Sequence, residues 1–151
     1  MDKKYCFSFI SASHSWMILI ILFFGLTGCS KEQNQDNIPV VAVNFFVYPN
    51  STEYLELNAV GGWVTVTGGY RGIIIYRKSV SEFMAFERAC PYDWEQSDAR
   101  VEVESSGLTA LCPSCKSKYI IIDGTPYEGP TTYPLKQYQT QYDGNQLYIF
   151  N

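Results

Sequence analysis

The sequence predicts an all-β protein beyond residue 40, and three observations support that prediction. Short runs rich in β-branched and aromatic residues recur along the chain, several with alternating apolar and polar positions. Glycine-containing turn pairs fall between these runs. No segment sustains the 3.6-residue apolar period of an amphipathic helix. Short strands with this spacing are typical of a small antiparallel sandwich or barrel.

Each expected strand has its own local justification. Residues 63–67, "WVTVT", alternate cleanly, as a half-buried strand does. Residues 72–79 carry a short apolar run that begins after Gly72 and ends in polar residues. The last two strands flank Asp143 and Gly144, a pair that favours a tight hairpin. The expected strands cover residues 40–48, 54–60, 63–67, 72–79, 82–89, 101–104, 108–112, 119–123, 137–143 and 146–150.

The first 28 residues have the pattern of a secretory signal peptide. Lys3 and Lys4 provide the basic start, and the apolar run 16–26 follows. The run is short for a membrane span. It ends in "LTGC", which resembles the bacterial lipobox, and this resemblance implies cleavage before Cys29 and lipid attachment to Cys29. Several acyl chains on one terminus would give a durable membrane anchor.

The rest of the chain divides into a tether and one domain. Residues 29–39 are polar and lack an apolar period, so we expect a flexible tether. Residues 40–151 are long enough for one domain with a modest core. We therefore expect a lipid-anchored protein of the bacterial cell envelope, in the outer membrane and facing the periplasm or the surface. Its expected partners are the membrane and an envelope protein that the sequence does not identify.

Charge and histidine content exclude several functions. The whole chain has 11 basic and 15 acidic residues, for a net charge of −4. Without residues 1–28 the balance is 9 against 14, or −5, which argues against nucleic acid as a partner. The single histidine, His14, lies in the leader. With no other histidine, no nucleophile elbow and no phosphate loop, the domain is not expected to be an enzyme.

The expected domain contains three cysteines, Cys90, Cys112 and Cys115. The last two form a Cys-x-x-Cys pair, as metal sites and redox proteins do. Thioredoxin-like chemistry needs a helix after the pair, whereas residues 116–130 have strand and turn composition. A four-cysteine zinc site needs a second close pair, and Cys90 has none.

The cysteines lie in two stretches, "EFMAFERACPYD" over residues 82–93 and "LCPSCKSKYIIIDGTPYEGPTTYPL" over residues 111–135, and the terminal hairpin follows. These stretches resemble a Rieske [2Fe-2S] domain. In that family Cys-Pro-x-His is followed by a serine and an aromatic residue, then a strand, a glycine turn, Gly-Pro, Pro-Leu and a closing hairpin. An upstream strand leads to a Cys-x-His motif. Here the first stretch matches the upstream strand and its motif, and the second stretch with the hairpin matches the rest. The resemblance implies a Rieske-like all-β fold with an inserted two-loop subdomain that binds the cluster.

The resemblance also implies a set of site residues. Cys90 and Cys112 occupy the family's two cysteine positions, whereas Tyr92 and Cys115 stand where the family has histidine. Ser117 and Tyr119 match positions that can hydrogen-bond the cluster and a cysteine ligand. The family's activity, electron transfer, is the ancestral function that the resemblance implies.

Three outcomes remain open for this altered ligand set. A [2Fe-2S] cluster could bind through Cys90, Cys112, Cys115 and an oxygen of Asp93 or Tyr92. A disulfide between Cys90 and either other cysteine could replace the cluster, leaving a metal-free binding or structural module. Zinc could bind the three thiolates and one oxygen.

Overall fold

The computed structural model describes residues 38–151, and no statement below concerns residues 1–37. The expected signal peptide, Cys29 and nearly all of the expected tether lie outside the described residues. Within residues 38–151, no helix is long and apolar enough to cross a membrane.

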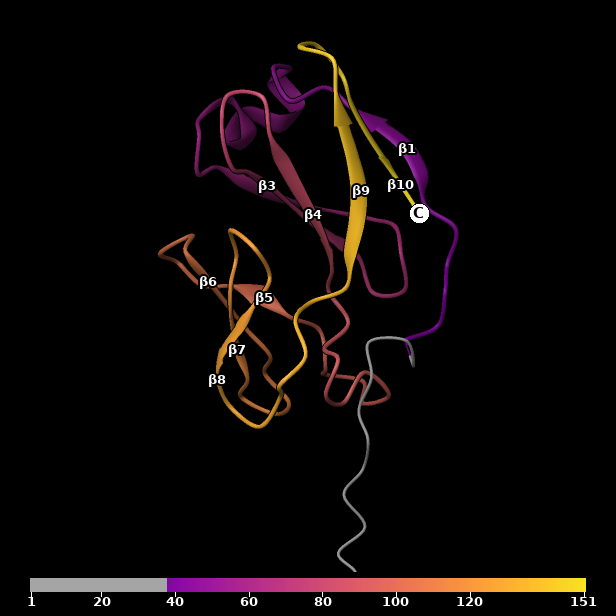
Figure 1. Cartoon of the computed structure of the whole chain (residues 1–151), viewed down its shortest axis with the longest axis vertical. Helices are drawn as coiled ribbons and strands as arrows, with labels where there is room; N and C mark the ends of the chain where they lie inside the picture. Colours follow the sequence, from indigo (N-terminus) through magenta and orange to yellow (C-terminus); the bar gives the residue numbers. More distant parts are fainter. Residues whose placement is uncertain (1–37) are drawn as a thin grey trace, which may run out of the picture. The chain divides into compact units, whose positions relative to one another are not determined.

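The larger of two antiparallel sheets has six strands (Figure 1). Within residues 38–151, the first and last strands pair with each other, Asn44 opposite Phe150, and the terminal hairpin then continues to the middle of the sheet. In spatial order the strands are β1 (Asn44–Val47), β10 (Leu147–Phe150), β9 (Gln137–Tyr142), β4 (Phe83–Glu87), β3 (Ile73–Arg77) and β2 (Trp63–Val66).

The smaller sheet is formed by a segment of the chain that lies between two neighbouring strands of the larger sheet. Its four strands are β5 (Glu102–Val103), β6 (Thr109–Leu111), β7 (Lys118–Ile120) and β8 (Pro126–Glu128). They follow β4 and precede β9, which pair directly in the larger sheet, with Ala85 opposite Tyr138. The smaller sheet is therefore an insertion, and its loops carry all three cysteines of the described region.

Strands β3 and β4 are buried on both faces and separate two apolar clusters. Because successive side chains of a strand point to opposite faces, Ile73 and Ile75 enter the cluster of the larger sheet. Ile74 and Tyr76 enter a second cluster that contains Ala110, Tyr119, Ile121, Cys90 and Cys112. The cysteine loops are thus packed on the same apolar cluster as the central strands.

The predicted fold class, an all-β antiparallel domain with an inserted two-loop subdomain, is confirmed. The strand expected over 54–60 is wrong, because residues Thr52–Asn58 form a 3₁₀ helix, η2. Its half-buried and buried side chains, Tyr54 and Leu57, lie three residues apart, which is the repeat of a 3₁₀ turn, whereas Leu55 is 61% exposed. The short strand β8 was not expected, since it begins with a proline.

Candidate metal centre

The first cysteine loop connects β4 to β5 and is closed at its base by strand-like hydrogen bonds. Ala89 pairs with Arg100 across the base, and the Cys90 N–H donates to the Ala99 carbonyl at 3.0 Å. Inside the loop, the Gln96 N–H donates to the Asp93 carbonyl at 2.8 Å and closes a turn. The loop thus contributes Cys90, at its base, and Asp93, which begins the turn.

The second cysteine loop connects β6 to β7 and is tighter. Its ends are joined by the Cys112 N–H, which donates to the Ser117 carbonyl at 2.9 Å, and the Lys116 N–H donates to the Cys112 carbonyl at 3.0 Å. Lys116 has a positive φ of 63°, the one such value at a non-glycine residue within the described region. This conformation is uncommon for a residue other than glycine, and here it turns the chain back so that the Ser117 carbonyl can accept from the Cys112 N–H.

The two loops bring together the four site residues that the sequence predicts as donors. One donor atom each from Cys90, Asp93, Cys112 and Cys115 lies within 4.8 Å of every other. The Cys90 and Cys115 sulfurs are 3.6 Å apart, and the Cys112 sulfur is 3.6 Å from Asp93 Oδ1. Cys90 and Cys112 are fully buried, whereas Cys115 and Asp93 are half-buried.

No disulfide joins the three cysteines, which are all free thiols. The 3.6 Å separation of the Cys90 and Cys115 sulfurs is far longer than a disulfide bond of about 2.05 Å. The disulfide alternative is therefore not realised in this structure.

Two hydroxyl groups contact the sulfurs, and both belong to residues that the sequence predicts. The Tyr119 hydroxyl lies 3.2 Å from Cys90 Sγ, and Ser117 Oγ lies 3.1 Å from Cys115 Sγ. Both side chains are fully buried. Hydrogen bonds of this kind orient a ligand sulfur and stabilise its thiolate form, which is the form that binds a metal.

The three thiols differ in how readily they lose a proton. Hydrogen bonding from the Cys90 thiol lowers the pKa of Cys112 to about 7, although burial opposes the change. The same hydrogen bond, together with burial, raises the pKa of Cys90. Burial also raises the pKa of Cys115, against its hydrogen bond with Ser117. Three thiolates at these distances would repel one another, and a bound cation would stabilise them together.

A third loop, between β8 and β9, packs over the second cysteine loop. The Thr131 N–H donates to Ser117 Oγ at 3.3 Å. Gly129 has φ 101°, and a Cβ placed on it would lie 2.5 Å from the Ser117 Cα. This close approach explains why the position holds glycine.

A fourth segment, the β2–β3 turn, holds the first cysteine loop from its outer side. Tyr70 packs edge-on against Trp94 at a centroid distance of 5.8 Å, and Arg71 Nη1 donates to the Ser97 carbonyl at 2.8 Å. The turn itself is held by Glu87, a fully buried carboxylate that accepts from the backbone N–H groups of Tyr70 and Arg71.

Sequence reasoning missed this role of Glu87. Its carboxylate also accepts from the Ala89 N–H at 3.0 Å and the Tyr138 hydroxyl at 2.6 Å, so both oxygens are satisfied. A glutamate that ends a strand is ordinarily solvated. The one feature of the sequence that could have indicated a buried carboxylate is the glycine-rich turn over residues 68–72, "GGYRG", whose backbone N–H groups need an acceptor. Tyr92, at the first histidine position of the resembling family, packs partly buried against the apolar cluster of the site.

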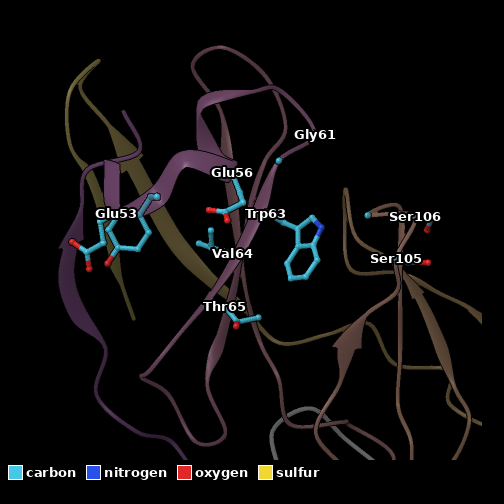
Figure 2. A pocket seen from close by; sticks show the side chains of 11 residues that line it. Glu53, Glu56, Gly61, Trp63, Val64, Thr65, Ser105 and Ser106 are labelled. Carbon is cyan, nitrogen blue, oxygen red and sulfur yellow. The ribbon is translucent and has the colours of Figure 1, made fainter. Parts of the chain in front are cut away.

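A separate surface pocket of about 640 Å³ contains none of the predicted site residues. Figure 2 shows its lining from η2, β2 and the β5–β6 turn, with the Trp63 ring facing Ser105 and Ser106. Glu53 and Glu56 supply its charge, and both are exposed. It holds no thiol, and we assign no chemistry to it.

Comparisons with known proteins give structural likenesses, two of which are described here. No protein-family model and no curated protein matches the chain. The ferredoxin of carbazole 1,9a-dioxygenase from Nocardioides aromaticivorans IC177 aligns with a TM-score of 0.42 and 17% identity, over 60% of this chain and 86% of that one. A complex of reduced oxygenase and oxidized ferredoxin in carbazole 1,9a-dioxygenase aligns with a TM-score of 0.46 and 17% identity, over 74% and 94%. These likenesses assign no function to this chain.

Proposed function

We propose that the domain is a metal-binding module of the cell envelope, in which one metal ion is held by Cys90, Cys112, Cys115 and Asp93. The observation that supports this function most directly is the convergence of three thiols and one carboxylate within 4.8 Å. Zinc is the best candidate, because it takes four sulfur, nitrogen or oxygen ligands in a tetrahedron. Bound there, the ion would hold the two cysteine loops together.

The spacing of the donors favours a single ion over a binuclear cluster. Ligands at about 2.3 Å from a tetrahedral centre lie about 3.8 Å from one another. The Cys90 and Cys115 sulfurs, at 3.6 Å, are close to that separation. In the Rieske arrangement, Cys90 and the residue at the position of Cys115 would bind different irons. Because two sulfides lie between the irons, these two ligand atoms would have to lie farther apart than 3.6 Å. The present geometry therefore does not fit that arrangement.

A second candidate function is electron transfer through a [2Fe-2S] cluster, and one specific observation favours it. The Tyr119 and Ser117 hydroxyls contact sulfurs on both loops, as the resemblance to the Rieske family implies. Because thiolates or carboxylate replace two neutral histidines, such a centre would have a lower reduction potential than a usual Rieske centre. In this case Cys115 and Asp93 would have to separate from the other donors to admit the cluster.

Metal analysis distinguishes the two functions. The protein is purified under anaerobic conditions from cells supplied with iron and zinc, and its zinc, iron and acid-labile sulfide are measured per chain. The single-ion proposal predicts zinc without sulfide, and cobalt exchanged into the site should give the visible spectrum of a tetrahedral thiolate complex. Iron with an equal amount of sulfide would support the electron-transfer candidate, and metal-free protein under both supplies would refute both candidates.

A further inference from the structure

A pocket of about 420 Å³ beside the first cysteine loop is lined by three arginines, Arg71, Arg88 and Arg100. The domain is acidic, and these residues are three of the four arginines in the chain. The rest of the lining is residues 66–70 and Gly72, which provide no carboxylate. The pocket is therefore positively charged although the protein as a whole is acidic, and such a pocket attracts a ligand of negative charge.

Hydrogen bonds hold two of the three arginine side chains, and each of the three keeps further donors. Arg88 Nε donates to the Val101 carbonyl at 3.0 Å, and Arg71 Nη1 donates to the Ser97 carbonyl at 2.8 Å. Each bond fixes one edge of a guanidinium group. The Arg100 side chain makes no hydrogen bond to any described residue, and none of the three arginines forms an ion pair within residues 38–151. Apart from Arg71 Nε, which is buried, the remaining N–H groups are therefore available to a ligand.

Two nearby carboxylates, Glu87 and Glu102, offset part of the charge of the three arginines but form no ion pair with them. Glu87 directs its oxygens to the backbone N–H groups of Tyr70, Arg71 and Ala89 and to a tyrosine hydroxyl, and it is fully buried. Glu102 is exposed, and it acts on Arg88 through its charge alone, without a hydrogen bond. Burial and the neighbouring charge of Arg100 lower the pKa of Arg88, so two like charges lie close together there. An anion between them would relieve that repulsion.

We propose that this pocket binds a phosphate group carried by a small molecule or a lipid headgroup. A carboxylate is satisfied by one guanidinium fork, whereas a tetrahedral phosphate can accept from several at once, which matches three convergent arginines. Gly72 makes room for Arg88, since a Cβ on it would lie 3.2 Å from Arg88 Cδ. The exposed ring of Tyr70 at the rim would contact the rest of the ligand.

Calorimetric titration of the purified protein with inorganic phosphate, pyrophosphate and phenyl phosphate tests the free-ligand source. Sedimentation with phosphatidylglycerol vesicles, against phosphatidylcholine vesicles, tests the lipid source. Arg100→Gln removes an exposed side chain and should fold normally, and it should weaken binding about tenfold or more. Lys78→Gln, which removes a charge on the β3–β4 turn, should change binding less than about twofold.

Saturable binding in the calorimetric or the vesicle experiment, weakened by Arg100→Gln and not by Lys78→Gln, supports the proposal. The experiment in which it is seen shows whether the phosphate belongs to a small molecule or to a lipid. Equal weakening by both variants would show a diffuse charge effect and overturn it, as would the absence of saturable binding in both arms. Binding of a polyglutamate peptide in preference to every phosphate compound would also overturn it. None of these outcomes depends on the metal content of the protein.

Discussion

At the scale of single residues, the site is defined by which donor atoms converge and by the hydroxyls that contact them. Cys90, Cys112 and Cys115 were identifiable from the sequence because closely spaced cysteines have few roles. The residue type of Asp93 does not by itself indicate a ligand, because a loop carboxylate is ordinarily solvated. The structure places its Oδ1 3.6 Å from the Cys112 sulfur, which makes it the fourth donor of the proposed site.

The role of Asp93 can be tested by substitution. Asp93→Ala should reduce metal affinity by at least about tenfold, since loss of a ligand should cost no less than loss of a residue that only orients one. Asp98→Ala removes an exposed carboxylate from the same loop and is the matched control. Competition with a metallochromic chelator measures both variants. Equal affinities for the two variants would remove Asp93 from the ligand set.

The buried pair of Glu87 and Tyr138 predicts a change in stability at alkaline pH. Burial, followed by the hydrogen bond and charge of Glu87, raises the pKa of Tyr138. An unfolded tyrosine loses its proton near pH 10, at about its ordinary pKa. Above that pH the unfolded state therefore binds fewer protons than the native state, and the free energy of unfolding falls as pH rises.

Tyr138→Phe tests this linkage. The variant should be less stable at neutral pH by about 1–2 kcal/mol, because Glu87 loses a donor. Its stability should then fall less steeply than that of the wild type above pH 10. Urea unfolding between pH 7 and 11 measures both quantities, and parallel pH profiles for the two proteins would contradict the linkage.

At the scale of elements, the site depends on four loops, two of which carry the donors. The β8–β9 loop covers Ser117, and the β2–β3 turn contacts Trp94 and Ser97 of the first cysteine loop. Sequence periodicity predicted the strands on either side of these loops. It could not predict that Glu87 would hold the β2–β3 turn, because that contact joins residues 16 and 17 positions apart through backbone N–H groups.

Two glycines with nearly the same backbone angle provide a matched test of the β8–β9 loop. Gly129 and Gly144 have φ values of 101° and 99°, but only Gly129 lacks room for a side chain. Gly144→Ala should cost about 1–2 kcal/mol from backbone strain alone. Gly129→Ala should cost more and should also weaken metal binding, because the added methyl group displaces Ser117.

Chemical denaturation and the chelator competition, applied to both glycine variants, give the comparison. Equal losses of stability with unchanged metal affinity would show that the contact between Gly129 and Ser117 does not support the site.

At the scale of the whole domain, the sequence predicted more of the fold than of the chemistry. Alternation and turn pairs indicated an all-β chain, and β3 and β4 were recognisable from their apolar runs. The η2 helix was missed because its apolar residues also suit a strand. The choice among cluster, disulfide and single ion could not be made from the sequence, because it depends on distances between sulfurs on two separate loops.

The proposed module combines two sites that share the first cysteine loop. Cys90 and Asp93 belong to the metal site, whereas Arg88 and Arg100, at the base of the same loop, line the arginine pocket. The two sites are independent proposals, since the arginine pocket needs no metal for its charge.

Metal stoichiometry is the most direct test of the central claim that the four donors hold one ion. Zinc, iron and acid-labile sulfide are measured per chain in anaerobically purified protein and in its Cys112→Ser variant, with Ser114→Ala as the control in the same loop. The single-ion site predicts one zinc per chain, no sulfide, and loss of zinc in Cys112→Ser alone. Two irons and two sulfides per chain, lost in the same variant, would contradict it.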